Sequence, residues 1–142
     1  MELQINYVAV LVAAFANFIF SALWYTPLFG KAWAKELGIT ASGPPPAAAF
    51  AKALIVGFVG QFLMAYVFAH NNMAWSFVPG MAEMPVAGKI ISAAVFTWLG
   101  FYVPADLDRV MWEGKSWKLF AINTGYHLGI TLIGATILIL MM

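Results

Sequence analysis

Cysteine is absent from this chain, and charged residues are scarce. Without cysteine the protein has no disulfide framework and no thiolate that could serve as a nucleophile or a metal ligand. Charged residues make up 9% of the 142 positions, whereas a soluble domain usually contains about a quarter. The formal net charge of +1 provides neither a basic surface for nucleic acid nor an acidic tail. These absences argue against a soluble domain and against a nucleic-acid-binding protein.

Hydrophobic residues are abundant instead, at 63% of the sequence. They are gathered in four runs, each close to the roughly 20 residues that an α-helix needs to cross a bilayer. Because the first residues lack the positively charged start of a signal peptide, we expect the first run to be retained as a span. The sequence predicts one domain, residues 1–142, with spans at about 5–25, 48–69, 84–103 and 119–140.

Two connections between these runs have an apolar side and a charged side. Residues 28–37 and 106–118 show this pattern, which is typical of helices that lie in the membrane interface. We therefore predict an all-α fold, an integral membrane four-helix bundle of two helical hairpins with amphipathic interfacial helices in the connections. Aromatic residues near span ends are typical of the belt at the membrane surface, and proline ends helices. The residues interpreted as interfacial anchors are Trp24, Tyr25, Pro27, Trp33, Trp98, Tyr102, Pro104 and Trp112.

Basic residues are distributed unevenly between the two sides of the predicted bundle. Six of the seven flank the two charged connections, and Lys89 alone lies near the other side. Because basic residues favour the cytoplasmic side, we expect these connections to be cytoplasmic and both termini to face outward. The six are Lys31, Lys35, Lys52, Arg109, Lys115 and Lys118.

The two halves of the chain carry a similar pattern. The segment Trp24-Tyr25-Thr26-Pro27 corresponds to Phe101-Tyr102-Val103-Pro104, and a charged connection follows each. Gln61 lies as far beyond Lys52 as His127 lies beyond Lys118, so the two residues occupy corresponding positions in the two halves. Since both hairpins would have the same topology, the pattern indicates a parallel repeat about an axis along the membrane normal.

Polar side chains within the hydrophobic runs are the strongest sign of a site. Asn123, Tyr126 and His127 share one face of the fourth helix. His127 lies roughly 13 Å along that helix, near the middle of a hydrocarbon layer about 30 Å thick. Groups at this depth need partners on neighbouring helices or in a wet cavity. Together with Asn17 and Gln61 they are predicted to form a polar site between the spans.

Two interpretations of this site are open at the level of the sequence. The site could hold a small ligand or relay protons, since a buried histidine can titrate near neutral pH. Alternatively, its members are interhelical hydrogen bonds, each stabilising the packing by on the order of 1 kcal/mol. No carboxylate lies within any predicted span, which argues against a proton-driven pump.

Two other clusters have competing interpretations. Asp106, Asp108 and Glu113 could act as acid and base, but the interleaved basic residues favour a solvated, mutually paired surface. His70 and the nearby methionines could bind copper(I), although methionine is a common filler of irregular apolar surfaces. Neither histidine has a second histidine at ligand spacing, so we expect no metal and no cofactor.

Several segments of the sequence are similar to a known family. They resemble the bacterial domain-of-unknown-function family 1761, and the similarity covers nearly the whole chain. The resemblance implies a small four-span protein of the bacterial inner membrane, and it implies no activity. The segments that carry it are Asn6-Tyr7, Trp24 to Trp33, Trp98-Leu99-Gly100-Phe101, Trp112-Glu113 and Lys118 to His127.

We expect a non-enzymatic binding or transport module for a small neutral or weakly basic solute. The alternative is an accessory or scaffold subunit of a larger membrane complex, because the chain has stripes of small residues that suit close helix contacts. Gly125 and Gly129 form one such stripe at four-residue spacing. Expected partners are the lipid bilayer and either further copies of the chain or other membrane subunits, without nucleic acid. An enzyme acting on lipid at the Asp106–Glu113 surface is a third alternative.

Overall fold

The structure is a computed structural model that describes residues 4–40 and 43–142. Within these residues the regular structure is entirely helical and contains no β-strand. The elements are α1 (Tyr7–Leu23), η1 (Trp24–Leu28), α2 (Gly30–Glu36), α3 (Ala47–Trp75), α4 (Val86–Thr97), η2 (Trp98–Tyr102), α5 (Val103–Met111) and α6 (Trp117–Met141). Here η1 and η2 are π-helical turns.

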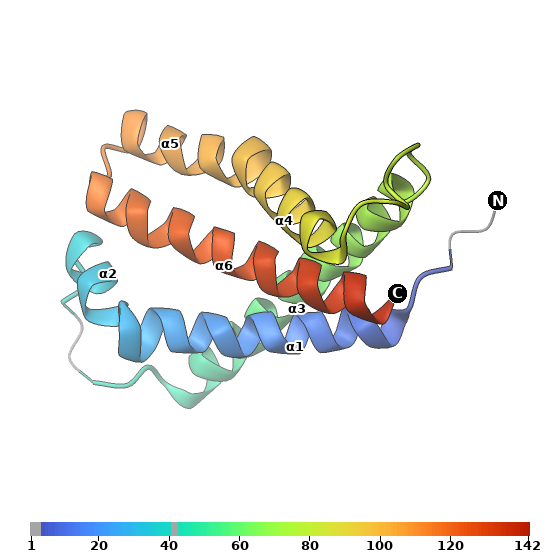
Figure 1. Cartoon of the computed structure of the whole chain (residues 1–142). Helices are drawn as coiled ribbons and strands as arrows, with labels where there is room; N and C mark the ends of the chain where they lie inside the picture. Colours follow the sequence, from blue (N-terminus) through green and yellow to red (C-terminus); the bar gives the residue numbers. More distant parts are fainter. Residues whose placement is uncertain (1–3, 41–42) are drawn as a thin grey trace.

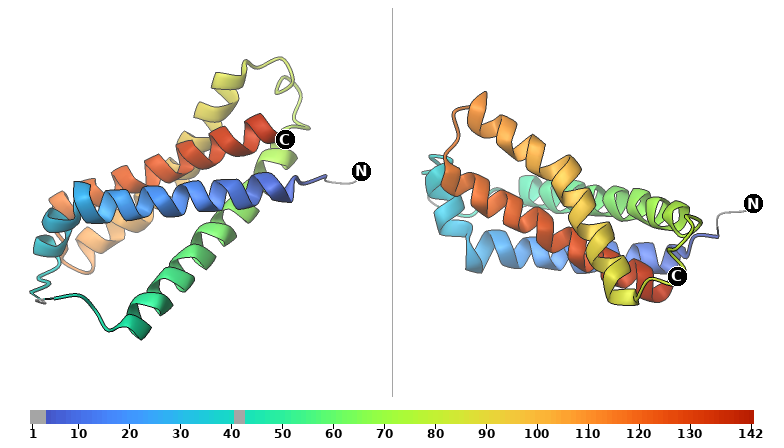
Figure 2. Two further views of the ribbon diagram at one scale, coloured as in Figure 1. Left: turned by 90° about the horizontal axis from the view of Figure 1, so that it is seen from below. Right: turned by 45° about the horizontal axis from the view of Figure 1, so that its top comes forward.

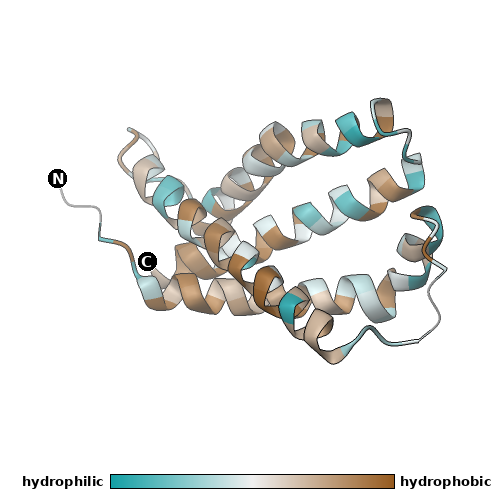
Figure 3. Cartoon of the chain, turned by 180° about the vertical axis from the view of Figure 1, so that it is seen from behind, coloured by the Kyte–Doolittle hydropathy of each residue, from teal (hydrophilic) through white to brown (hydrophobic). Residues whose placement is uncertain are grey.

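Four helical segments are long and apolar enough to cross a membrane, which confirms the prediction of an all-α, four-span protein. They are Tyr7–Leu28, Ala47–Trp75, Val86–Met111 and Trp117–Met141. Successive spans run in opposite directions, so the two hairpins have the same topology (Figure 1). Hydrophilic residues gather along α5 and the first half of α6, whereas the second half of α6 and most of α3 are hydrophobic (Figure 3).

Helix α6 is the central element of the bundle, because it packs against every other α-helix. The principal contacts place the spans in the order α3, α1, α6 and α4, and α3 makes no extensive contact with α4. The C-terminal half of α3 lies against the bundle, while its N-terminal half diverges from it (Figure 2). The bundle is therefore closely packed around α6 and open along α3.

The core is built largely from alanine. Ala9 and Ala13 of α1, Ala65 of α3 and Ala135 of α6 are completely buried. Because methyl groups fill so little space, the helix backbones approach closely, which is how spans associate without a hydrophobic driving force between them. Larger apolar side chains are mostly exposed on the outside, where lipid would cover them.

Each π-helical turn lies beside a proline. Pro27 is inside η1, and Pro104 is the second residue after η2, in the first turn of α5. An α-helix cannot accept proline without losing a hydrogen bond and meeting a carbonyl four residues back. The wider turn removes this conflict, and in both turns the amide after the turn bonds to the tryptophan carbonyl at its start. Such turns are frequent at functional sites.

The second amphipathic connection, predicted over 106–118, is helical up to Met111, and α6 begins at Trp117. Helix α5 continues from η2 and ends at Met111, so the third span runs from Val86 to Met111 instead of ending near residue 103. The π-helical turn explains this, because it lets the helix continue past Pro104. The first connection does contain a short separate helix, α2.

Side-chain caps tie the helix ends together. The Asn6 carboxamide oxygen accepts from the amides of Val8 and Ala9, and its nitrogen donates to the Met141 carbonyl at 2.8 Å. Ser116 accepts from the Leu119 amide at the start of α6 and donates to the Glu36 carboxylate at 2.5 Å. The first cap joins α1 to the end of α6, and the second joins α6 to α2.

Candidate functional site

A histidine of α6 and a carboxylate of α5 form a close pair within the bundle. His127 Nδ1 lies 2.7 Å from Asp106 Oδ2, and the exposed fractions of the two side chains are 22% and 4%. An ionised carboxylate only accepts hydrogen bonds, so with Asp106 ionised the Nδ1 atom carries the proton. The Tyr102 ring stacks on the imidazole, with centroids 4.4 Å apart. Tyr102 and Asp106 are four residues apart and so reach His127 from the same face.

A second polar cluster lies on the other side of α6. The Tyr126 hydroxyl is 2.5 Å from Ser21 Oγ of α1 and accepts from Gln61 Nε2 of α3 at 2.9 Å. Ser21 in turn is bonded to the carbonyl of Asn17. Three spans therefore meet at one hydroxyl group, and Tyr126 is buried there.

The two clusters are linked through aromatic rings. The Tyr126 ring lies 5.3 Å from the imidazole of His127 and 4.8 Å from the Tyr25 ring, between centroids. The Tyr25 hydroxyl donates to Asn123 Oδ1 at 2.8 Å. Asn123, Tyr126 and His127 thus engage three different neighbours around α6, and together they form a polar belt near the middle of the helix.

Several buried polar atoms in this region have no hydrogen-bond partner. Asn17 is completely buried, and Met64 Sδ at 3.7 Å is the sole partner of its side-chain nitrogen among the described residues. Its oxygen is unpaired, as are the Gln61 oxygen and the Thr124 hydroxyl. Turning either amide over would leave its nitrogen unpaired instead. A buried polar group without a partner is costly, so these atoms call for a water or a ligand.

The partner of His127 differs from the expected one. Amides of the first hairpin were expected to meet the imidazole, but Gln61 bonds to Tyr126, and His127 bonds to Asp106 of its own hairpin. No carboxylate was expected in a span, whereas Asp106 lies in Val86–Met111, a helical segment long and apolar enough to cross a membrane. The burial of Asp106 against His127 was not predicted, because Pro104 was interpreted as the end of the helix. The four-residue spacing from Tyr102 was the available signal.

The carboxylate cluster of the sequence is divided in the structure. Asp106 is buried against His127, Asp108 is exposed, and Glu113 pairs with Arg109 at 3.4 Å. The interpretation of all three as a solvated paired surface therefore holds for Glu113 and fails for Asp106. They do not converge on one surface site.

Four of the residues interpreted as anchors make specific contacts with α6. The indole nitrogen of Trp24 donates to the Ile122 carbonyl at 3.1 Å, and that of Trp98 donates to the Thr124 carbonyl at 2.8 Å. Tyr25 and Tyr102 turn toward α6 as described above. These four position the polar belt, so the anchor interpretation is incomplete for them. Trp112, 86% exposed, remains free to lie at the membrane surface, and Trp33 lies edge-on to Tyr25.

The second histidine has a local role. His70 Nδ1 lies 2.8 Å from the Tyr66 carbonyl of the preceding turn, and its ring contacts the Tyr66 ring. Across residues 4–40 and 43–142 no three side chains of His, Asp or Glu gather as they would around a metal ion. The described residues therefore offer no built metal centre.

Comparison with protein families assigns the chain. The sequence profile of the family described as "Protein of unknown function (DUF1761)" matches residues 8–139. The chain belongs to the DUF1761 family. Neither a curated protein nor a solved structure has significant similarity to this DUF1761 chain. The matched range covers nearly all of the four spans and includes the polar belt, and this DUF1761 protein is a membrane protein of unknown activity.

Proposed function

We propose that this protein is a non-enzymatic binding or transport module for a small neutral or weakly basic solute. Its site is the polar belt of Asn123, Tyr126 and His127 together with Asn17, Gln61 and Asp106. We further propose that it resides in a bacterial inner membrane with both termini outside and the charged connections in the cytoplasm. The basic residues flanking α2 and α5 support this orientation.

The observation that carries the proposal is the buried Asp106–His127 pair within membrane-spanning helices. A carboxylate and an imidazole in a span are expensive, and such groups usually mark a substrate, ion or proton path. Packing alone is achieved more simply by apolar residues, because replacing a buried ion pair with them is often neutral or stabilising. The pair therefore favours a role in ligand handling.

The unpaired amide groups indicate the chemistry of the ligand. Asn17 and Gln61 each offer a buried oxygen without a donor, one on α1 and one on α3. A solute that carries N–H or O–H groups could satisfy these oxygens, and Asp106 would favour a weakly basic one. Neutral and weakly basic small solutes are thus preferred over anions.

Solute entry into proteoliposomes tests the proposal. We expect vesicles containing the protein to take up methylamine, imidazole or urea faster than empty vesicles, as followed by light scattering after osmotic shock. His127→Leu should remove the difference. Thr136→Val is the matched control on α6, because that hydroxyl donates to the Leu132 carbonyl of its own helix and lies outside the belt. A fully active His127→Leu variant, or no faster uptake of any of the three solutes, would contradict the proposal.

A second candidate is an accessory or scaffold subunit, which the exposed half of α3 favours. Residues 47–57 are exposed along the whole stretch, and an added Cβ at Gly60 would meet nothing within 4 Å. Small residues in a bare face suit docking of another span or a second copy of the chain. Extraction in a gentle detergent that preserves membrane complexes discriminates the two candidates. Recovery as a lone monomer would count against the subunit role.

A further inference from the structure

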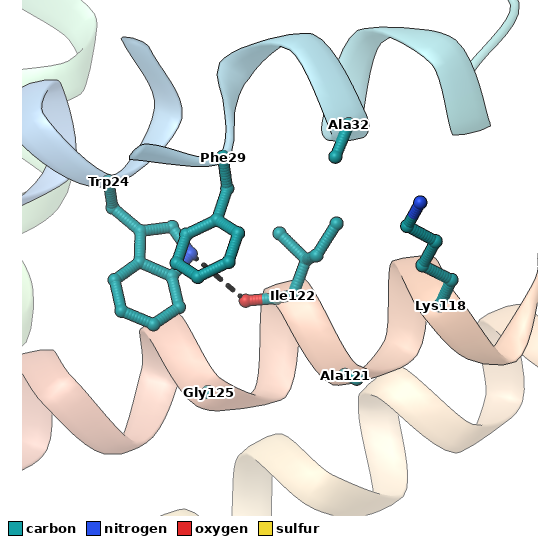
Figure 4. Close-up of a pocket in the computed structure, with 7 residues that line it drawn as sticks. All are labelled: Trp24, Phe29, Ala32, Lys118, Ala121, Ile122 and Gly125. Carbon is teal, nitrogen blue, oxygen red and sulfur yellow. Dashed lines mark hydrogen bonds between the residues drawn. The ribbon is translucent and has the colours of Figure 1, made fainter. Parts of the chain in front are cut away.

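A groove with carbon walls lies between the η1–α2 corner and the first half of α6 (Figure 4). Its volume is about 360 Å³. The single polar atom of the Trp24 ring is already used, because the indole nitrogen donates to the Ile122 carbonyl. The lining residues are Trp24, Phe29, Ala32, Lys118, Ala121, Ile122 and Gly125.

Two features of the sequence maintain the shape of this groove, a glycine on α6 and a pair of aromatic rings. A Cβ added at Gly125 would lie 3.3 Å from the Trp24 ring, so glycine lets the indole rest directly on α6. The Trp24 and Phe29 rings pack together with centroids 4.5 Å apart. The groove is open on one side, since Phe29, Lys118 and Ala121 are exposed. In a bilayer that side faces lipid.

One end of the groove carries a positive charge. The Lys118 side chain extends from α6 toward α2 (Figure 4). Among the described residues the ion pairs are Arg109–Glu113 and His127–Asp106, so no described carboxylate lies within 4 Å of the Lys118 ammonium. The nearby Glu36 carboxylate is bonded to Ser116 instead.

We propose that the groove binds an anionic phospholipid, with an acyl chain against Trp24, Phe29 and Ala121 and the phosphate at Lys118. Carbon walls beside a lysine at the end of a span match an acyl chain joined to an anionic headgroup. Zwitterionic lipids offer the same chain and the same phosphate, but the ammonium of their own headgroup balances that charge, so they fit the groove with a weaker attraction to Lys118. This site is separate from the polar belt and does not depend on the function proposed above.

Native mass spectrometry of the full chain tests this site with phosphatidylglycerol and phosphatidylcholine of identical acyl chains. We expect the first phosphatidylglycerol molecule to bind more tightly than phosphatidylcholine. Lys118→Gln should weaken phosphatidylglycerol binding about fivefold, as expected for one lysine near the membrane surface, and weaken phosphatidylcholine binding less. Lys118 is exposed, so the substitution leaves the packing intact.

Two further variants separate the groove from a general surface charge. Lys52→Gln is the matched control, because Lys52 opens the other lysine-led span and does not line the groove. It should change binding less than twofold. Ala121→Phe should fill the groove and weaken both lipids. Two results would overturn the proposal. One is an equal loss of phosphatidylglycerol binding in Lys52→Gln and Lys118→Gln, and the other is undiminished phosphatidylglycerol binding in either Lys118→Gln or Ala121→Phe.

Discussion

Replacing His127 by leucine tests whether the imidazole and the Asp106 carboxylate form one energetic unit. The Nδ1–Oδ2 distance of 2.7 Å is typical of a charge-assisted hydrogen bond, and the carboxylate is 4% exposed. With leucine present, the carboxylate stays buried without its donor. Removing one partner of a buried pair costs about 3–5 kcal/mol. Because some solvent reaches the pair, we expect the free energy of unfolding to fall by about 3 kcal/mol, at the lower end of that range.

Asp106→Leu should cost less than His127→Leu. The imidazole left behind can be neutral and is 22% exposed, so the expected cost is that of one interhelical hydrogen bond, about 1 kcal/mol. The double variant removes both polar groups and should lie within about 1 kcal/mol of the original chain. The pairwise coupling free energy is therefore expected to be about 3–5 kcal/mol.

Reversible unfolding in mixed micelles, followed by fluorescence of the six tryptophans, measures all four members of this cycle. Additive single effects, with coupling below about 0.5 kcal/mol, would refute the reasoning. The double variant also separates structure from function. If it is stable and loses solute uptake, the pair acts in the proposed path; if it is stable and retains uptake, the pair is structural.

Three further predictions concern the surroundings of the belt, each measured by thermal unfolding unless stated. Tyr126→Phe should cost about 1 kcal/mol, because Ser21 and Gln61 lose their shared hydroxyl partner; an unchanged midpoint would contradict it. Gly129→Ala should cost about 1–3 kcal/mol, because its methyl would lie 2.5 Å from the Phe20 ring. Gly100→Ala is the control, because a Cβ at that position would meet nothing within 4 Å, and this variant should be as stable as the original chain. Ser116→Ala should cost about 1 kcal/mol and speed amide exchange in the first turn of α6, since the Leu119 amide loses its cap; unaltered exchange would count against this role.

The four spans could be predicted because long apolar runs have few alternatives to a membrane helix. The helical spacing of the polar residues in α6 also predicted that they face other helices, and Asn123 and Tyr126 are buried. Ala9 and Ala13 form a stripe of small residues at four-residue spacing, and both are in the core. The other stripe behaves differently, because Gly125 and Gly129 accommodate the rings of Trp24 and Phe20 instead of another backbone.

The partners of the polar residues could not be predicted to the same degree. Adjacent positions on a helix point about 100° apart, so Tyr126 and His127 reach different neighbours although both lie on a broad polar face. The π-helical turn before Pro104 is a local adjustment of the backbone without a sequence signature of its own. It decides that α5 continues the third span and brings Asp106 to His127. Knowledge of the tertiary packing was needed to find this pair.

The central position of α6 has a consequence for biogenesis. α6 is the last of the four spans to leave the ribosome, yet α1, α3 and α4 all pack on it. During translation the third span therefore enters the bilayer with the Asp106 carboxylate still lacking its imidazole, and the earlier hairpin lacks the tyrosine that joins its Ser21 and Gln61. The contacts that α6 makes with the three earlier spans can therefore form only after its own insertion.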